Sequence, residues 1–196
     1  MYTTNSTFNS YGTTVFELMS RLAVEYKSIN LGQGFPDDYG PNAVLQKASE
    51  YLFDLPNQYP PMLGVPELRQ AVAAHNKRFY GLDIDWKIET MVSSGATEGL
   101  AACFLGLLNQ GDEVVVIEPL YDCYLPMIER AGGIPKRVSI EPPDWKLSGS
   151  ALRAAFSHKT KLVLINSPQN PSSKVYHREE LLLIADLVKE HDAIAI

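Results

Sequence analysis

Two short apolar runs, at 113–117 and 161–165, constrain the fold of this chain more than any other feature. They are rich in Val, Leu and Ile and lack polar alternation, as strands do when both faces of a parallel sheet are covered. From residue 88 onward such segments alternate with helical patterns. Strands are expected at 88–92, 113–117, 136–140, 161–165 and 193–196, and helices at 96–109, 121–131, 148–156 and 178–191. This alternation predicts an α/β fold with a mostly parallel sheet sandwiched by helices.

The first part of the chain has a different organisation. Residues 1–33 are expected to form a polar N-terminal arm and a short helix, whose apolar stripe includes Phe16 and Met19. Glycine and proline are too dense at 31–38 for a regular element. Two further helices are expected at 42–55 and 66–80, the second opening with a proline in its first turn.

Composition argues against several classes of partner. The chain has 17 basic and 23 acidic residues, a net charge of −6 and no basic cluster, so neither nucleic acid nor an anionic membrane is expected as a partner. No apolar run reaches the roughly 20 residues needed to span a bilayer, and the first residues lack the features of a signal peptide. Cys103 and Cys123 lack metal-ligand spacing and are expected to be reduced thiols, so no metal site and a cytoplasmic location are expected.

Three loops are expected to carry the function, because ligands of parallel sheets bind beyond the carboxyl ends of the strands. These loops are 93–97, 118–124 and 166–173. The first opens a helix with Gly95, Ala96 and Thr97, whose free N–H groups and positive dipole end suit a phosphate. The alternative is an ordinary capped turn between a strand and a helix.

The other two loops carry groups that suit a flat, polar ligand. Tyr121 can stack on a heterocycle, although a tyrosine in a loop can also simply pack against the protein. Asn166 and Asn170, held by proline-containing turns, can donate to a ring oxygen or a carboxylate. Asn and Pro are also common in turns that bind nothing, so a purely structural loop remains an alternative.

A series of short motifs runs along nearly the whole chain. The motifs are NLGQGFPD (30–37), NQY (57–59), GVPELR (64–69), GATE (95–98), GDEV (111–114), EPLYDCY (118–124) and NSPQNP (166–171). With these motifs in this order, the chain resembles the N-terminal half of class I aminotransferases, which are fold-type-I enzymes that use pyridoxal 5'-phosphate. It is most similar to the branch that holds kynurenine/glutamine and methionine aminotransferases.

The resemblance implies a role for each candidate residue. Gly95, Ala96 and Thr97 would hold the cofactor phosphate, Tyr121 would stack on its pyridine ring, and Asn170, with Asn166 close by, would bind its phenolic oxygen. A second group would face the neighbouring subunit and the substrate. Tyr59 would reach the phosphate in the other subunit of a homodimer with shared sites. Gly34 would lie against the substrate carboxylate, and Phe16 would line the pocket for the substrate's side chain. Phe16, Gly34 and Asn170 are thus the expected substrate contacts. The substrates would be an amino acid and a 2-oxo acid.

The resemblance also divides the chain and leaves its catalytic residues elsewhere. It implies an arm and small-domain segment at 1–33 and a large cofactor-binding domain at 34–196, incomplete at its C-terminal end. The Schiff-base lysine, an aspartate for the pyridine nitrogen and an arginine for the substrate carboxylate are expected after Ile196, so the 196 residues alone are expected to be inactive. The segment Ser172-Ser173-Lys174 superficially resembles the lysine motif, but it lies directly after Asn170-Pro171, where the family leads into its next helix.

Two points stay open at the level of sequence. Ser173 stands where the family usually has glycine, and it would strain the turn if that position needs a positive φ. The alternative functions are a β-lyase acting on sulfur-containing amino acids and, if the gene ends here, a non-catalytic dimerising α/β module.

Overall fold

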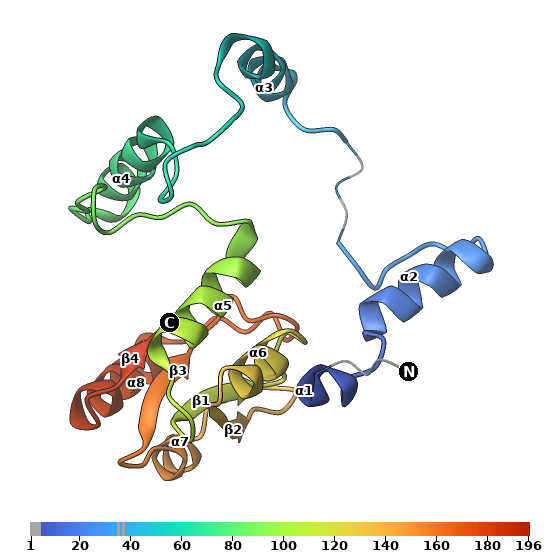
Figure 1. Cartoon of the computed structure of the whole chain (residues 1–196). Helices are drawn as coiled ribbons and strands as arrows, with labels where there is room; N and C mark the ends of the chain where they lie inside the picture. Colours follow the sequence, from blue (N-terminus) through green and yellow to red (C-terminus); the bar gives the residue numbers. More distant parts are fainter. Residues whose placement is uncertain (1–4, 35, 37) are drawn as a thin grey trace. The chain divides into compact units, whose positions relative to one another are not determined.

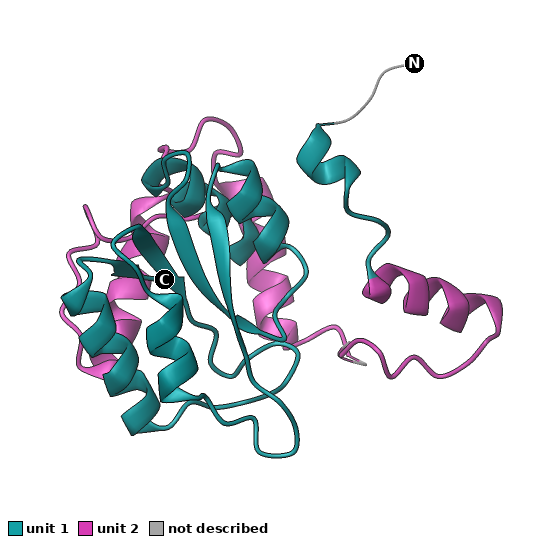
Figure 2. Cartoon of the chain, turned by 90° about the horizontal axis from the view of Figure 1, so that it is seen from below, with its two compact units in different colours: residues 1–14, 96–196 teal, residues 15–95 magenta. Residues whose placement is uncertain are grey.

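The computed structural model describes residues 5–34, 36 and 38–196. Contacts divide the chain into two compact units, one made of Met1–Thr14 with Ala96–Ile196 and one of Val15–Gly95 (Figure 2). Two positions of the motif at 30–37, Phe35 and Asp37, lie outside the described residues. Each unit is described by itself below.

The first unit contains a parallel sheet, as the sequence predicts. Its strands are β1 (Glu113–Glu118), β2 (Ile134–Ser139), β3 (Thr160–Leu164) and β4 (Ile194–Ala195), in the order β2-β1-β3-β4 (Figure 1). All three pairings are parallel. The chain moves from β1 to one neighbour and then returns to the other side of β1. The strand order therefore reverses between β1 and β3, which is where ligands bind in sheets of this kind.

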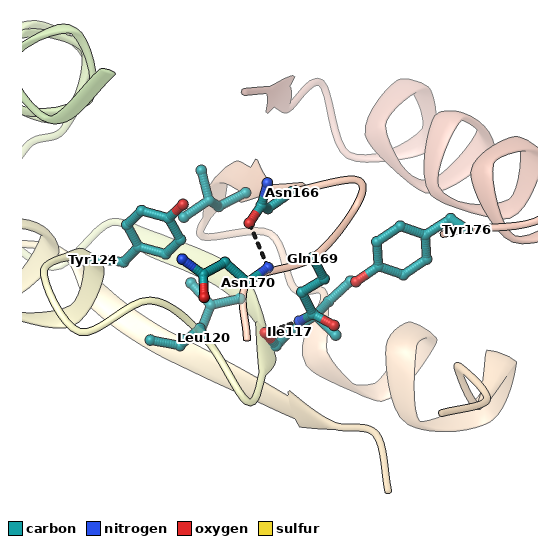
Figure 3. A pocket seen from close by; sticks show the side chains of 9 residues that line it. Ile117, Leu120, Tyr124, Asn166, Gln169, Asn170 and Tyr176 are labelled. Atoms are coloured by element: carbon teal, nitrogen blue, oxygen red, sulfur yellow. Dashed lines mark hydrogen bonds between the residues drawn. The ribbon is translucent and has the colours of Figure 1, made fainter. Parts of the chain in front are cut away.

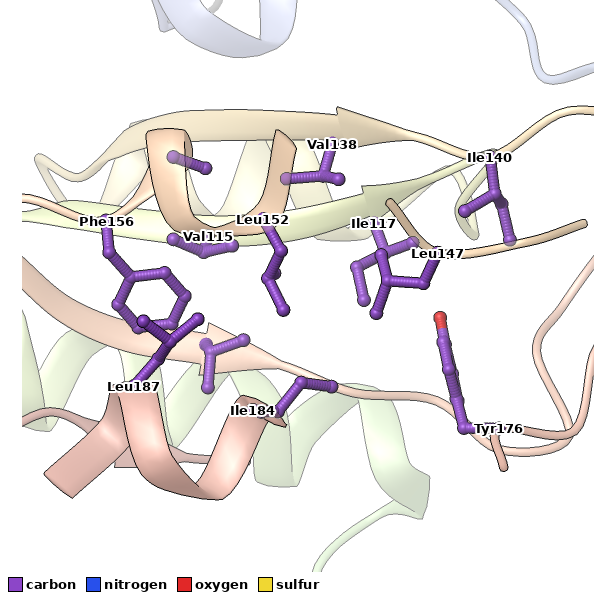
Figure 4. Close-up of a cluster of buried hydrophobic side chains, with 12 residues drawn as sticks. Val115, Ile117, Val138, Ile140, Leu147, Leu152, Phe156, Tyr176, Ile184 and Leu187 are labelled. Carbon is purple, nitrogen blue, oxygen red and sulfur yellow. The ribbon is translucent and has the colours of Figure 1, made fainter. Parts of the chain in front are cut away.

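Helices cover both faces of this sheet. They are α5 (Gly95–Leu107), α6 (Tyr124–Arg130), α7 (Gly149–Ala155) and α8 (Arg178–Glu190). Val114 and Val116 of β1 pack in one cluster with Phe104 of α5, whereas Val115 packs in another cluster with Leu152 of α7 and with α8 (Figure 4). Because alternate residues of β1 enter two different cores, the strand is apolar throughout, which explains the unbroken run in the sequence. The α/β prediction is confirmed.

The remaining helices carry the first part of the chain. In the first unit, α1 (Ser6–Asn9) adds a single turn where only a polar arm was expected, with the side chain of Asn5 accepting from the N–H of Thr7 at its start. In the second unit, α2 (Val15–Glu25), α3 (Asn42–Asp54) and α4 (Pro66–Tyr80) correspond to the expected helices. No helix in the described part of the chain combines the length and the apolar character needed to cross a membrane.

The expected strand at 88–92 is wrong, and a side chain distant in sequence explains why. Arg69 of α4 is buried, and its guanidinium donates to the carbonyl oxygens of Trp86, Lys87 and Thr90 at 2.7–2.9 Å. The segment starts as a turn in which the N–H groups of residues 88 and 89 both donate to the carbonyl of Asp85. These backbone groups are satisfied by a side chain and a turn, so they do not form a ladder.

Candidate functional site

A small cavity marks the point where β1 and β3 diverge. The paired register of these strands ends at Val116 and Leu164, and the chain leaves each strand in a loop. The cavity between these loops has a volume of about 10 Å³, which makes it the floor of a site rather than room for a whole cofactor. Figure 3 shows the side chains of Tyr124, Asn166 and Asn170 at one end of this cavity and Tyr176 at the other.

The loop after β3 presents one amide that is available to a ligand. The Oδ1 atom of Asn166 accepts a hydrogen bond of 2.8 Å from the backbone N–H of Asn170, which fixes the backbone of that residue. The side-chain amide of Asn170 is exposed and makes no hydrogen bond to any other described residue. Ser173 closes the same loop with a φ of 60°, and its N–H donates to the carbonyl of Gln169 at 2.7 Å. The loop therefore needs the left-handed conformation that the sequence suggested for Ser173.

The loop after β1 presents aromatic side chains. The rings of Tyr121 and Tyr124 lie 5.7 Å apart in an edge-to-face arrangement, and both residues are half-buried. Burial raises the pKa of the Tyr124 hydroxyl above its ordinary value, with smaller contributions from Cys123 and Tyr121. The Tyr124 hydroxyl therefore acts as a neutral hydrogen-bonding group at physiological pH. Tyr124 supports the ring of Tyr121 from its edge.

The start of α5 supplies backbone donors. Gly95 has a φ of 77°, which only glycine adopts without strain, and its N–H donates to the carbonyl of Ser93 at 2.9 Å. Ala96 and Thr97 are exposed in the first turn, where N–H groups have no acceptor within the helix. Burial raises the pKa of the Cys123 thiol, and a hydrogen bond with Thr97 partly offsets this effect. That hydrogen bond joins the start of α5 to the loop that carries Tyr121.

The other candidates belong to the unit formed by Val15–Gly95. Tyr59 is 94% exposed with a φ of 51°, and it borders an open groove of about 680 Å³ that is lined by residues 51–68. Phe16 is half-buried in α2. Gly34 is exposed, and a Cβ atom there would meet nothing within 4 Å. The roles expected for Tyr59, Phe16 and Gly34 stay predictions.

Sequence reasoning missed three residues of the cavity wall. Tyr124, Gln169 and Tyr176 line it beside the expected asparagines. Tyr124 and Gln169 stand inside the motifs already noted, so their position beside Tyr121 and Asn170 was a usable signal. Tyr176 is the third residue after the loop at 166–173. Its hydroxyl has no hydrogen-bond partner among the described residues.

Comparison with known proteins identifies the family. The sequence pattern of Aminotransferase class I and II matches residues 26–196. The chain belongs to this family. It is 38% identical over 185 residues to the methionine aminotransferase of Escherichia coli (strain K12), a match that covers 94% of this chain and 48% of that protein. It is 37% identical to the kynurenine–oxoglutarate transaminase of Dictyostelium discoideum, with coverage of 93% and 46%.

A solved structure agrees with these sequence matches. The N-succinyldiaminopimelate aminotransferase of Mycobacterium tuberculosis superposes with a TM-score of 0.93 and 42% identity, covering 98% of this chain and 51% of that one. The chain therefore spans about half the length of the relatives and solved structures that it matches.

Proposed function

We propose that this chain forms the cofactor-binding part of an aminotransferase that uses pyridoxal 5'-phosphate and moves an amino group between an amino acid and a 2-oxo acid. The observation that carries the proposal is a set of contacts within the unit that holds the sheet. The loops after β1 and β3 line one cavity, and Thr97 in the first turn of α5 is hydrogen-bonded to Cys123 of the loop after β1. A phosphorylated, flat and polar ring needs these three kinds of group together.

The start of α5 suits the phosphate. The N–H groups of Ala96 and Thr97 are exposed at the positive end of a 13-residue helix, and Gly95 allows the chain to turn into it. The residues bind the phosphate with backbone donors, so the attachment does not depend on a titrating side chain.

The two sheet loops suit the ring. Tyr121 packs against one face of the pyridine, supported by Tyr124, and the free amide of Asn170 donates to the phenolic oxygen. Asn166 holds Asn170 in place, because its Oδ1 atom accepts a hydrogen bond from the backbone N–H of Asn170. When bound, the cofactor supplies an electron sink for the charge that develops at the substrate's α-carbon.

The remaining assignments extend the proposal beyond one subunit. Tyr59 donates to the phosphate in the partner of a homodimer, which its exposure supports. Phe16 and Gly34 contact the substrate, together with Asn170. The arm of 1–33 and the large domain of 34–196 are the proposed division, and the Schiff-base lysine belongs to neither segment. Two free, half-buried cysteines support a cytoplasmic location.

The proposal is tested by cofactor binding and product analysis in the protein expressed from its complete gene. We expect a visible absorption band with pyridoxal 5'-phosphate and conversion of an amino acid to its 2-oxo acid. Release of ammonia and pyruvate from a cysteine conjugate without net amino transfer would instead support the β-lyase. Asn170→Ala is expected to weaken cofactor retention about tenfold or more, as loss of a hydrogen bond to a charged oxygen does. Asn42→Ala, at an exposed position of α3, is the matched control. Failure of the wild-type protein to bind the cofactor would refute the proposal.

A further inference from the structure

Gln169 is a buried polar residue of the cavity wall. It is 4% exposed, and its side chain crosses from the loop after β3 to the loop after β1. The Nε2 atom donates to the carbonyl oxygen of Ile117 at 2.9 Å and to that of Pro119 at 2.8 Å. The Oε1 atom accepts from the hydroxyl of Ser172 at 2.7 Å. Both N–H donors and the oxygen of the amide are therefore used.

These hydrogen bonds take the place of backbone pairing between β1 and β3, which ends before Ile117. Regular pairing between β1 and β3 ends at Val116, so the carbonyls of Ile117 and Pro119 extend past the last paired residue. Buried carbonyl groups without partners are costly, and strands that diverge cannot satisfy one another. The amide of Gln169 satisfies two of them at once. In doing so it bonds the loop that carries Asn170 to the loop that carries Tyr121.

The backbone around Gln169 is fixed as firmly as its side chain. Its N–H donates to the carbonyl of Lys174 at 2.8 Å, and its own carbonyl accepts from the N–H of Ser173 at 2.7 Å. The next residue is Asn170, whose N–H is held by Asn166. A movement of the Gln169 side chain is therefore transmitted to Asn170 through one peptide unit.

We infer that Gln169 is a positioning residue: it holds Asn170 and Tyr121 at a fixed separation, so that the amide and the aromatic ring reach the same cofactor. This inference rests on the proposed function for the identity of the ligand. Its mechanical part, that Gln169 orders the loop of Asn170 through the two carbonyls, rests on the described contacts alone.

Two variants separate positioning from general stability. Gln169→Glu keeps the size of the side chain but turns oxygen atoms toward two carbonyl oxygens, so both donated hydrogen bonds are lost. Ser172→Ala is milder, because the two hydrogen bonds from Gln169 to Ile117 and Pro119 stay in place. It removes the hydroxyl that donates to the amide oxygen and that also accepts from the N–H of Lys174 at 3.3 Å. Gln70→Glu, the same chemical change at an exposed position of α4, is the control.

The measurements are amide hydrogen exchange in the cofactor-free protein and retention of pyridoxal 5'-phosphate, both made in the complete protein. We expect the N–H groups of Asn170 and Ser173 to exchange about tenfold faster in Ser172→Ala, with a larger increase in Gln169→Glu. The N–H of Val115, in the centre of β1, keeps its rate in Ser172→Ala. Cofactor retention falls in the same order, and Gln70→Glu matches the wild type in both measurements.

Each result has a distinct meaning. Unchanged exchange at Asn170 and Ser173 in Ser172→Ala overturns the inference, as does equal acceleration at Val115, which would indicate a loss of overall stability. If Gln169→Glu does not fold, the exchange rate of the Asn170 N–H in Ser172→Ala still decides the matter, because neither hydrogen bond of the Ser172 hydroxyl is made to Asn170. Faster loop exchange with unchanged cofactor retention also overturns the positioning role. If the wild-type protein binds no pyridoxal 5'-phosphate, the proposed function fails and the cofactor part of the inference falls with it. The exchange rates then still decide whether Gln169 holds the two loops together.

Discussion

Removal of the Tyr176 hydroxyl is expected to stabilise the protein. Tyr176 is 5% exposed and packs in the cluster of Leu147, Leu152 and Ile184, with its hydroxyl directed toward Leu147 (Figure 4). That hydroxyl has no hydrogen-bond partner among the described residues. Burial of an unpaired hydroxyl costs about 1–3 kcal/mol, whereas loss of one oxygen leaves a gap that costs less than about 1 kcal/mol. Tyr176→Phe should therefore raise the free energy of unfolding by about 1 kcal/mol.

The same substitution should change the response of stability to alkaline pH. Burial, with a smaller contribution from the charge of Glu180, raises the pKa of Tyr176 from 10.0 to about 12. An acid whose pKa is higher in the folded state gives stability that is fully present below the unfolded pKa and is lost as pH rises through the folded pKa. A shift of this size corresponds to about 2–3 kcal/mol, lost between about pH 10 and pH 12. Tyr176→Phe lacks this loss, so its advantage should widen as pH rises through that range.

Urea unfolding of both proteins at pH 7 and above pH 10 measures these effects. Tyr11→Phe is the matched control, because the Tyr11 hydroxyl does have a partner and donates to Oε2 of Glu129 at 3.0 Å. It should lower the free energy of unfolding by up to about 1 kcal/mol, the opposite sign from Tyr176→Phe. If Tyr176→Phe destabilises the protein as much as Tyr11→Phe does, its hydroxyl has a hydrogen-bond partner and the reasoning is refuted.

Two further substitutions test the loop after β3 and its attachment to α8. Burial alone would raise the pKa of Glu180, but hydrogen bonds from His177, Lys174 and Leu147 outweigh it and hold the pKa below its ordinary value. The stability that this carboxylate provides is thus present above the unfolded pKa and lost as pH falls through the folded pKa. Glu180→Gln should cost about 3 kcal/mol at pH 7 and weaken the acid dependence of unfolding, whereas the exposed Glu179→Gln should do neither. Ser173→Gly should stabilise the protein by about 0.5 kcal/mol, because relief of the left-handed strain exceeds the entropy that glycine loses. Ser49→Gly within α3 should destabilise it in the same unfolding assay, and a loss at both positions would contradict the strain at Ser173.

The sheet could be predicted because its signal is local. Each strand of the central pair carries its apolar residues consecutively, and β1 and β3 were expected at 113–117 and 161–165, close to where they lie. The carboxyl ends of parallel strands share one edge, so the sequence already predicts that the loops after β1 and β3 meet. The convergence of Asn166 and Asn170 with Tyr124 at one cavity follows from that rule.

The errors and omissions depend on contacts between distant residues. Nothing in 88–92 shows that its carbonyls are satisfied by Arg69, which stands 21 residues before Thr90. Likewise, nothing near Gln169 shows that its amide reaches Ile117, 52 residues earlier. Hydrophobic periodicity indicates which face of a helix or strand is buried. It does not indicate that a polar side chain donates to the backbone carbonyls of a segment distant in sequence.

Lys174 illustrates how such contacts decide the chemistry of a residue. The sequence around it resembles a cofactor-binding lysine motif, yet Lys174 is buried with its Nζ atom 3.0 Å from Oε1 of Glu180. The same atom lies 5.3 Å from the centre of the Tyr176 ring. A lysine that attacks a carbonyl needs an amine that can reach the substrate, whereas Nζ of Lys174 is buried and held in an ion pair with Glu180. Lys174 therefore anchors the loop after β3 to α8, which agrees with our proposal that a different lysine takes part in the reaction.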